Sequence, residues 1–322
     1  MKLSYLLVTL LSVWLSGLTC TAAQPDTLAI HFATQPEAQH LLTADDEFTA
    51  GLNQFDYDLR LSKPHSTADE WRQLARHETR SWAPGEKQRI IKAFRTLRQN
   101  VQQMQLQLPY PEEVVLVKTT MREELRAGGY TRKNWIALGA LELIYANDDQ
   151  LATLLAHELF HVLSRHSASF KQAVYATIGF RLLDHEIVFP ADVMQKRISN
   201  PDIAHRNSYT ELILEGKKTR CAEMIYTDRP YTSGSILDYL HVGFIPLNAR
   251  FEPVVVGGKT VIYPLDQVAE QFKAQVGTNT NYNIDPEEIS ADHFSFLLTK
   301  KKGLPNPEII DAIRTALQTP RR

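Results

Sequence analysis

The chain has 322 residues, of which 43% are hydrophobic and 22% charged, a composition typical of globular proteins and unlike that of disordered or fibrous ones. Its 35 basic and 37 acidic residues nearly cancel, so the basic excess that binds a nucleic-acid backbone is missing, and no nucleic-acid partner is expected. The two cysteines, Cys20 and Cys221, are too few for a disulfide framework or a thiolate zinc site. Any chemistry must therefore use other side chains.

The first 23 residues have the pattern of an export signal. Lys2 gives a positive start, residues 3–18 are mostly apolar, and Thr21-Ala22-Ala23 offers the small residues that signal peptidase needs. We therefore expect an exported protein, periplasmic or secreted. A lipid anchor on Cys20 is the alternative, which the preceding Leu18-Thr19 fits poorly. No other stretch approaches the roughly 18 apolar residues that span a bilayer, so no transmembrane segment is expected after signal removal.

The first third of the remaining chain predicts helices. Residues 24–66 are polar with weak periodicity, and we expect them to form a linker or pro-like region. Apolar residues at helical spacing predict helices over 67–82 and 84–108, which make a helical N-terminal region over 67–112.

Helical and strand-like patterns alternate in the rest of the chain, which predicts an α+β fold. Strands at 114–118 and 130–138 precede a helix over 148–166, and residues 184–210 are expected to be irregular. The further expected elements are a helix over 169–183, strands over 220–226, 242–246 and 254–263, and helices over 267–275, 285–298 and 307–317.

Residues 157–161 read His-Glu-Leu-Phe-His, within the predicted helix over 148–166. Side chains four residues apart lie on one helix face, so His157 and His161 can bind one zinc ion together. Glu158 projects beside them, where its carboxylate can reach a water molecule at an open coordination position. The apolar face lies opposite and would turn these side chains toward a cleft; it consists of Leu151, Ala152, Leu155, Leu159, Val162 and Leu163.

A third metal ligand must come from another segment. His166 falls on the apolar side of the helix and is better explained as a core or helix-end residue. Residues 288–292 read Glu-Ile-Ser-Ala-Asp, in the helix predicted over 285–298. Glu288 and Asp292 share one helix face, so Glu288 can complete the zinc site while Asp292 accepts a hydrogen bond from a ligand imidazole.

The two motifs resemble those of the gluzincin metallopeptidases, in which His-Glu-x-x-His is completed by Glu-x-x-x-Asp. Residues 130–166, which contain Ala-His-Glu and end in Arg-His, are similar to the prenyl-protein-endopeptidase and HtpX group, whose second motif is Glu-x-x-Ala-Asp. Thermolysin-like enzymes carry Asn before the ligand glutamate, where this chain has Glu287. The chain therefore resembles the gluzincin clan as a whole and not one named family within it.

The resemblance implies a zinc metalloendopeptidase that hydrolyses a protein or peptide substrate. One Zn²⁺ ion would be held by His157, His161 and Glu288, with Glu158 as general base and not as a ligand. The strand ahead of the motif helix, residues 133–139, would pair with the substrate backbone. For the oxyanion-stabilising residue that the reaction needs, the preferred candidates are His205 and Tyr209, followed by Tyr231 and His241.

The expected fold is zincin-like, with a small sheet packed on the motif helix and a mostly helical C-terminal part. The catalytic domain would cover residues 113–300, with 184–284 as a β-containing insertion between the motifs, and a C-terminal helix would follow over 301–322.

The main alternative function is a zincin-fold binding or chaperone-like protein of the cell envelope that holds zinc but does not cleave. Glu158 argues against it, because zinc binding alone does not require that carboxylate. Cys221 is expected to be a small core residue and not a nucleophile. Gly257-Gly258 predicts a hairpin turn, and Pro253 stands where a phosphate-binding loop would need its first glycine.

Overall fold

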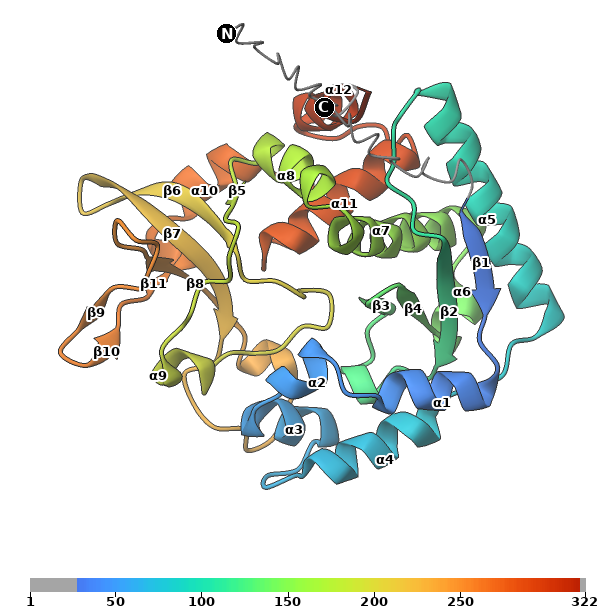
Figure 1. Ribbon diagram of the computed structural model, residues 1–322, viewed down its shortest axis with the longest axis horizontal. Helices are drawn as coiled ribbons and strands as arrows, with labels where there is room; N and C mark the ends of the chain where they lie inside the picture. The colour runs from blue at the N-terminus through green and yellow to red at the C-terminus, as the bar shows by residue number, and fades with distance from the viewer. Residues whose placement is uncertain (1–27, 319–322) are drawn as a thin grey trace, which may run out of the picture.

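The computed structural model describes residues 28–318, so the predicted export signal and Cys20 lie outside the described residues. The described chain has the predicted α+β class, with two larger sheets at opposite sides of the molecule, a two-stranded hairpin, and a group of helices between and around the larger sheets (Figure 1). Among residues 28–318, no helix is both long and apolar enough to cross a bilayer.

The first sheet is mixed and has the strand order β1-β2-β4-β3. Strands β1 (Ala29–Phe32), β2 (Glu113–Thr119) and β4 (Trp135–Gly139) are parallel, and β3 (Gly129–Arg132) runs antiparallel to β4. The prediction of one strand over 130–138 is wrong, because the chain reverses at Lys133, whose φ of 50° is a turn conformation. Strand β3, and not β4, is therefore the edge strand at this end of the sheet, and β1 is the edge strand at the other end.

The prediction of a linker over 24–66 is also wrong for the described part of that range. It contains β1 and three helices, which have 9, 5 and 8 residues and are too short to show clear periodicity. Each helix instead begins with a capping box, in which a polar side chain and the residue three positions later bond each other's backbone N–H groups. These helices are α1 (Gln35–Thr43, capped by Thr34), α2 (Glu47–Gly51, capped by Asp46) and α3 (Gln54–Leu61, capped by Asn53).

The two predicted N-terminal helices are present as α4 (Ala68–Glu78) and α5 (Pro84–Gln103). Helix α5 begins at Pro84, where the fixed φ of proline suits the first helical position. Its apolar stripe packs against the motif helix in the largest core cluster, through Ile90, Phe94, Leu97 and Val101.

The central helix, α7 (Asp148–His166), carries the first motif, and its apolar residues Leu151, Leu155, Leu159, Val162 and Leu163 are buried. It packs against β3 and β4 on one side and contacts helices α5, α8 and α11 on others (Figure 1). The other helices of this part are α6 (Ala140–Tyr145), α8 (Ala168–Thr177), α11 (Pro286–Leu298) and α12 (Pro307–Gln318).

The second sheet has five antiparallel strands in the order β11-β8-β7-β6-β5. It lies within the segment between the two motifs, as expected, but β5 and β6 fall in stretches that were predicted to be helical or irregular. Helix α8 ends before Gly179, whose φ of 75° breaks the helix, and β5 follows. The strands are β5 (Arg181–Leu182), β6 (Ser208–Leu214), β7 (Lys217–Tyr226), β8 (His241–Pro246) and β11 (Tyr263–Pro264).

Short elements complete this region. The predicted hairpin is present. It joins β9 (Val255–Val256) to β10 (Lys259–Thr260), and its turn is formed by Gly257 and Gly258, whose φ values are 60° and 77°. Cys221 is fully buried in the main core cluster, as predicted. The remaining elements are α9 (Ala191–Met194), α10 (Ala269–Val276) and the 3₁₀ turns η1 (Arg122–Glu124), η2 (Ile236–Asp238) and η3 (Leu265–Gln267).

Candidate metal centre

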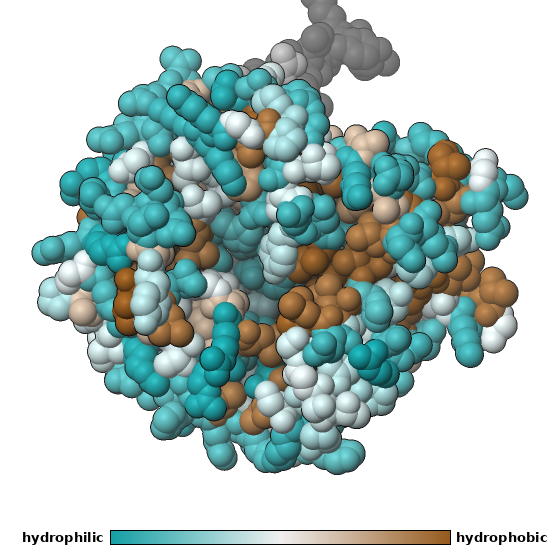
Figure 2. Space-filling model, turned by 180° about the vertical axis from the view of Figure 1, so that it is seen from behind, coloured by the Kyte–Doolittle hydropathy of each residue, from teal (hydrophilic) through white to brown (hydrophobic). Residues whose placement is uncertain are grey.

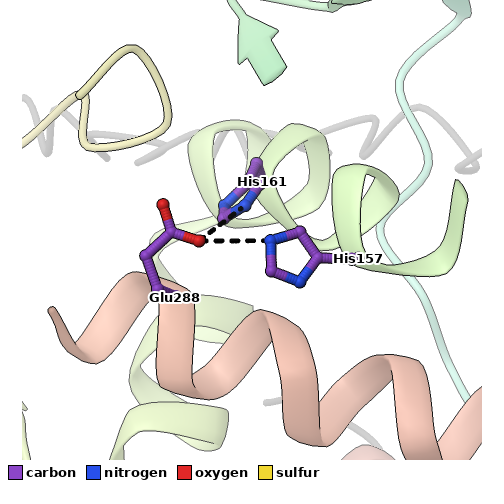
Figure 3. Close-up of side chains that lie close together, drawn as sticks. All are labelled: His157, His161 and Glu288. Carbon is purple, nitrogen blue, oxygen red and sulfur yellow. Dashed lines mark hydrogen bonds and ion pairs between the residues drawn. The ribbon is translucent and has the colours of Figure 1, made fainter. Parts of the chain in front are cut away.

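Helices α7 and α11 bring His157, His161 and Glu288 together (Figure 3). Glu288 Oε2 lies 3.1 Å from Nε2 of His157 and 3.6 Å from Nε2 of His161. Helix α11 is capped by Asp285 and begins at Pro286, which places Glu288 in the first turn, where the helix dipole favours a carboxylate. The three residues predicted as ligands thus meet although more than 120 positions separate the two motifs.

The two separations between Glu288 and the histidine nitrogens fit a tetrahedral zinc site, and all three donor atoms lie within 4.8 Å of one another. Zinc bonds of about 2.0–2.2 Å separate neighbouring ligand atoms by roughly 3.4 Å, close to both observed distances. Nε2 of His161 is fully buried and has no hydrogen-bond partner among the described residues. A buried nitrogen without a partner is costly unless something binds it, and a metal ion at this position would.

Both histidines are oriented by a carboxylate on their other ring nitrogen. Asp292 Oδ1 lies 2.9 Å from Nδ1 of His157, as predicted, and Glu287 Oε1 lies 3.2 Å from Nδ1 of His161. An ionised carboxylate can only accept, so each Nδ1 carries a proton. Nε2 of His157 also donates to Glu288 in this structure, and a metal ion bound there would replace that proton. Glu287 was missed as a functional residue, because its partner His161 lies on another helix.

Glu287 is itself held by a buried network. Tyr175 donates its hydroxyl to Oε2 at 2.6 Å, Lys171 Nζ lies 3.1 Å from the same oxygen, and Ser164 donates to Oε1. Burial alone would raise the pKa of Glu287, but the Lys171 ammonium and the bond to His161 outweigh it and hold the pKa well below the usual range. The carboxylate that orients His161 is therefore ionised at any physiological pH.

Replacement of Glu287 by alanine should destabilise the protein by about 3–5 kcal/mol, because it leaves the ammonium of Lys171 buried without a counter-ion. Urea unfolding of the metal-free protein measures this loss. The matched control is Glu211→Ala, which removes the partner of Lys218, whose side chain is 67% exposed, and should cost about 1 kcal/mol or less. Equal losses in the two variants would refute the assigned role of the Glu287 network.

Glu158 lies beside the three candidate ligands and is held against strand β3. Thr131 donates its hydroxyl to Glu158 Oε2 at 2.7 Å. The other oxygen, Oε1, faces Gly129 so closely that a Cβ at position 129 would lie 2.7 Å from it. A side chain at position 129 would therefore displace the carboxylate of Glu158 from this place, and Oε1 is the oxygen left to accept a proton from outside the network.

The environments of the two central carboxyl groups move their pKa values in opposite directions. Burial raises the pKa of Glu158, and the nearby histidines lower it only in part. Burial also raises the pKa of Glu288, but the hydrogen bond to His157 and the charge of His161 lower it by more, so that the pKa lies below its ordinary value. This difference suits a proton acceptor at Glu158 and an ionised metal ligand at Glu288.

A segment between α9 and β6 forms another wall of the site. Asn200 donates its amide to Oε1 of Glu288, and Asp202 Oδ1 accepts the N–H of Thr131 at 2.6 Å. Asp202 also lies 4.0 Å from Nε2 of His161, so Glu158, His161 and Asp202 form a second group that could hold a metal. The set with Glu288 is favoured because Glu288 Oε2 lies 3.1 and 3.6 Å from the two imidazole nitrogens, whereas Asp202 lies 4.0 Å from its one histidine.

The candidate centre opens into a cleft of about 1260 Å³, lined by His157, Glu158, Glu288 and Asp292. Figure 2 shows a hollow in this face of the molecule with hydrophobic residues gathered along one side. The apolar residues that line the cleft from the region between the motifs and the loops beside it are Leu125, Ile198, Ile225, Ile236, Leu237, Leu240 and Ile284. We call this set the apolar wall.

The prediction that residues 133–139 pair with the substrate backbone is wrong, because these residues lie mostly in β4, which is paired with another strand on both sides. The edge strand beside the motif helix is β3. The backbone N–H and C=O of Thr131 bond Asp202 and Arg165, so these groups point away from β4. Gly129 lies two residues earlier on the same strand, and its backbone groups therefore point to the same side. Gly129 lines the cleft and is the point at which an extended peptide can reach this edge.

The structure does not bring the expected oxyanion residues to the site. His205 is exposed and bonded to Glu186, and Tyr209 is buried against Phe251 at the second sheet. Tyr231 packs in another core cluster, and His241 lies on the exposed side of β8. None of these four residues lines the cleft. Tyr282, which no local pattern marks, does line it.

Comparisons of this chain with protein-family models, with curated proteins and with solved structures found no match.

Proposed function

We propose that the protein is a zinc-dependent peptidase with a zincin-like arrangement of its site. The observation that supports this best is the meeting of His157, His161 and Glu288 at ligand distances, with a carboxylate, Glu158, held beside them and not among them. A site that only stored zinc would need no such free carboxylate. The export signal expected at residues 1–23 would place the activity outside the cytoplasm.

Zinc bound by these three ligands would polarise the peptide carbonyl and acidify a water molecule. Glu158 takes the proton of that water on Oε1, because Oε2 is occupied by the hydroxyl of Thr131. The same carboxyl group then passes the proton to the leaving amine nitrogen. Gly129 lets Glu158 lie close to the edge of β3, where the backbone of the substrate would bind.

The apolar wall favours peptides with large apolar side chains near the cleaved bond. Leu237 is 82% exposed and Leu240 and Ile284 are partly exposed, so these side chains are free to contact a ligand. Burial of one leucine-sized side chain against them would contribute about 1.5–3 kcal/mol to binding. The cleft is also lined by polar residues, which include Asn147, Asp149 and Gln150.

Tyr282 lines the cleft and is our candidate for the residue that stabilises the negative charge developing on the carbonyl oxygen. The charge of Glu288 raises the pKa of Tyr282, which is 45% exposed, so its hydroxyl stays protonated and can donate a hydrogen bond. Tyr282→Phe should lower kcat by about 10²-fold and leave the zinc content unchanged. Tyr263→Phe, which removes a hydroxyl bonded to Glu215 at the second sheet, is the control and should not change kcat. Equal kcat values for Tyr282→Phe and the unaltered protein would exclude this role.

The proposed function is tested by incubating the purified protein with an unfolded protein substrate and analysing the products by mass spectrometry. We expect cleavage beside large apolar residues, loss of cleavage with a zinc chelator, and recovery when zinc is added back. Zinc-loaded protein that binds the substrate but never cleaves it would instead support a binding or chaperone-like role.

A further inference from the structure

A second, strongly basic cavity lies on the other side of the segment that carries Asn200 and Asp202. Its volume is about 30 Å³, two to three times what one water molecule needs, and it shares Ser199, Asn200 and Pro201 with the cleft. Five basic and two acidic side chains line it, an excess of three positive charges. They are Arg132, Lys133, Arg165, Arg197 and Arg206, with Asp46 and Glu47.

Most of this charge is not neutralised within the protein. Arg132 is paired with Asp46 at 2.6 Å. In contrast, Arg165, Arg197 and Arg206 have no carboxylate within 4.0 Å among the residues that the structure describes. The partners of Arg165 are backbone carbonyls, and those of Arg197 are a carbonyl and the Ser199 hydroxyl.

Two guanidinium nitrogens of this cavity are buried without a hydrogen bond. They are Nε of Arg197, whose residue is only 3% exposed, and Nη1 of Arg165. Burial and the nearby charge of Arg206 lower the pKa of Arg197 to about 10, so it is still protonated at neutral pH. Asp56 attracts Arg197, but its oxygens are already bonded to Arg60 and Ser199. Buried positive charges of this kind are stable only with a counter-ion.

We propose that this cavity binds a small oxyanion with two negative charges, such as phosphate or sulfate. Guanidinium groups bind such anions through paired N–H donors, and the cavity is large enough for the anion but too small for a peptide side chain. The anion would connect α7, through Arg165, to the segment that bonds Glu288 and Thr131 through Asn200 and Asp202. The site does not depend on a bound metal.

The test is thermal unfolding of the full chain during titration with inorganic phosphate, in excess chelator and at ionic strength held constant with sodium chloride. The chelator excludes any effect of phosphate through zinc. We expect a saturable rise in Tm of about 3 °C, and one phosphate per chain in isothermal titration calorimetry. Acetate, with a single charge, should not reproduce the rise.

Arg206→Gln should abolish the saturable rise, because it removes one of the three unpaired guanidinium groups. Lys133→Gln, which changes an exposed side chain at the mouth and cannot perturb the core, should weaken phosphate binding several-fold. Arg250→Gln, at an arginine whose side chain is 79% exposed and paired with Glu252, is the control and should keep the full rise. The proposal is overturned if the Tm does not rise saturably, or if Arg206→Gln and Lys133→Gln both respond as the unaltered protein does.

Discussion

Glu158→Gln should reduce peptide cleavage by at least 10²-fold, and by about 10⁴-fold if proton transfer limits the reaction, while one zinc ion stays bound. Glutamine keeps the shape that fits beside Gly129 and can still accept the hydroxyl of Thr131, so the fold and the ligand set are preserved. It cannot take a proton from water. Kcat and zinc content are measured on the same preparation.

Glu270→Gln is the matched control, because the side chain of Glu270 is 95% exposed on α10 and, among the described residues, forms an ion pair only with Lys273, at 3.8 Å. It should cleave at the rate of the unaltered protein. If Glu158→Gln cleaves at that rate too, Glu158 is not the general base and the proposed mechanism is wrong.

Glu288→Ala should weaken zinc binding by more than about 100-fold, because it removes one of the three protein ligands in the proposed site. The two histidines on α7 would remain, and they alone bind zinc weakly. Zinc should consequently raise the Tm of the unaltered protein but not that of the variant. Competition with a fluorescent chelator gives the two affinities directly.

Asp292→Asn provides the graded comparison. Asp292 contacts the distal nitrogen of His157 and not the metal position, so its replacement should cost only 10- to 100-fold in zinc affinity. If Asp292→Asn weakened zinc binding more than Glu288→Ala, the assignment of ligand and supporting residue would have to be exchanged.

The parts of the site that local sequence patterns define were predictable. The local sequences of helices α7 and α11 contain the patterns that predict them. These are caps at Asn147 and Asp285, an apolar face, and functional side chains spaced one turn apart. The arrangement of His157, His161, Glu288 and Asp292 follows from those patterns once the helices pack face to face.

The residues that complete the site were not predictable, because tertiary packing and not local spacing brings them there. Thr131 reaches Glu158 only because the chain reverses at Lys133 and makes β3 the edge strand. Asn200 and Asp202 come from a segment without clear periodicity. Glu287, next to a predicted ligand, could have been suspected from its position in the first turn of α11, but its partner His161 lies on another helix.

The N-terminal region shows a different limit of sequence patterns. Residues 24–66 looked like a linker because their helices are short and β1 has only four residues. The capping boxes at Thr34, Asp46 and Asn53 were the available signal, and they mark helix starts that periodicity does not detect. This region also supplies Asp46 and Glu47 to the basic cavity.

The most direct test of the central claim is to measure zinc content and peptide cleavage together in one preparation of the unaltered protein, as zinc is removed and restored. The proposed function predicts one zinc ion per chain and a cleavage rate that rises in proportion to zinc occupancy. Full cleavage by zinc-free protein, or no cleavage of any unfolded substrate by fully zinc-loaded protein, would contradict it.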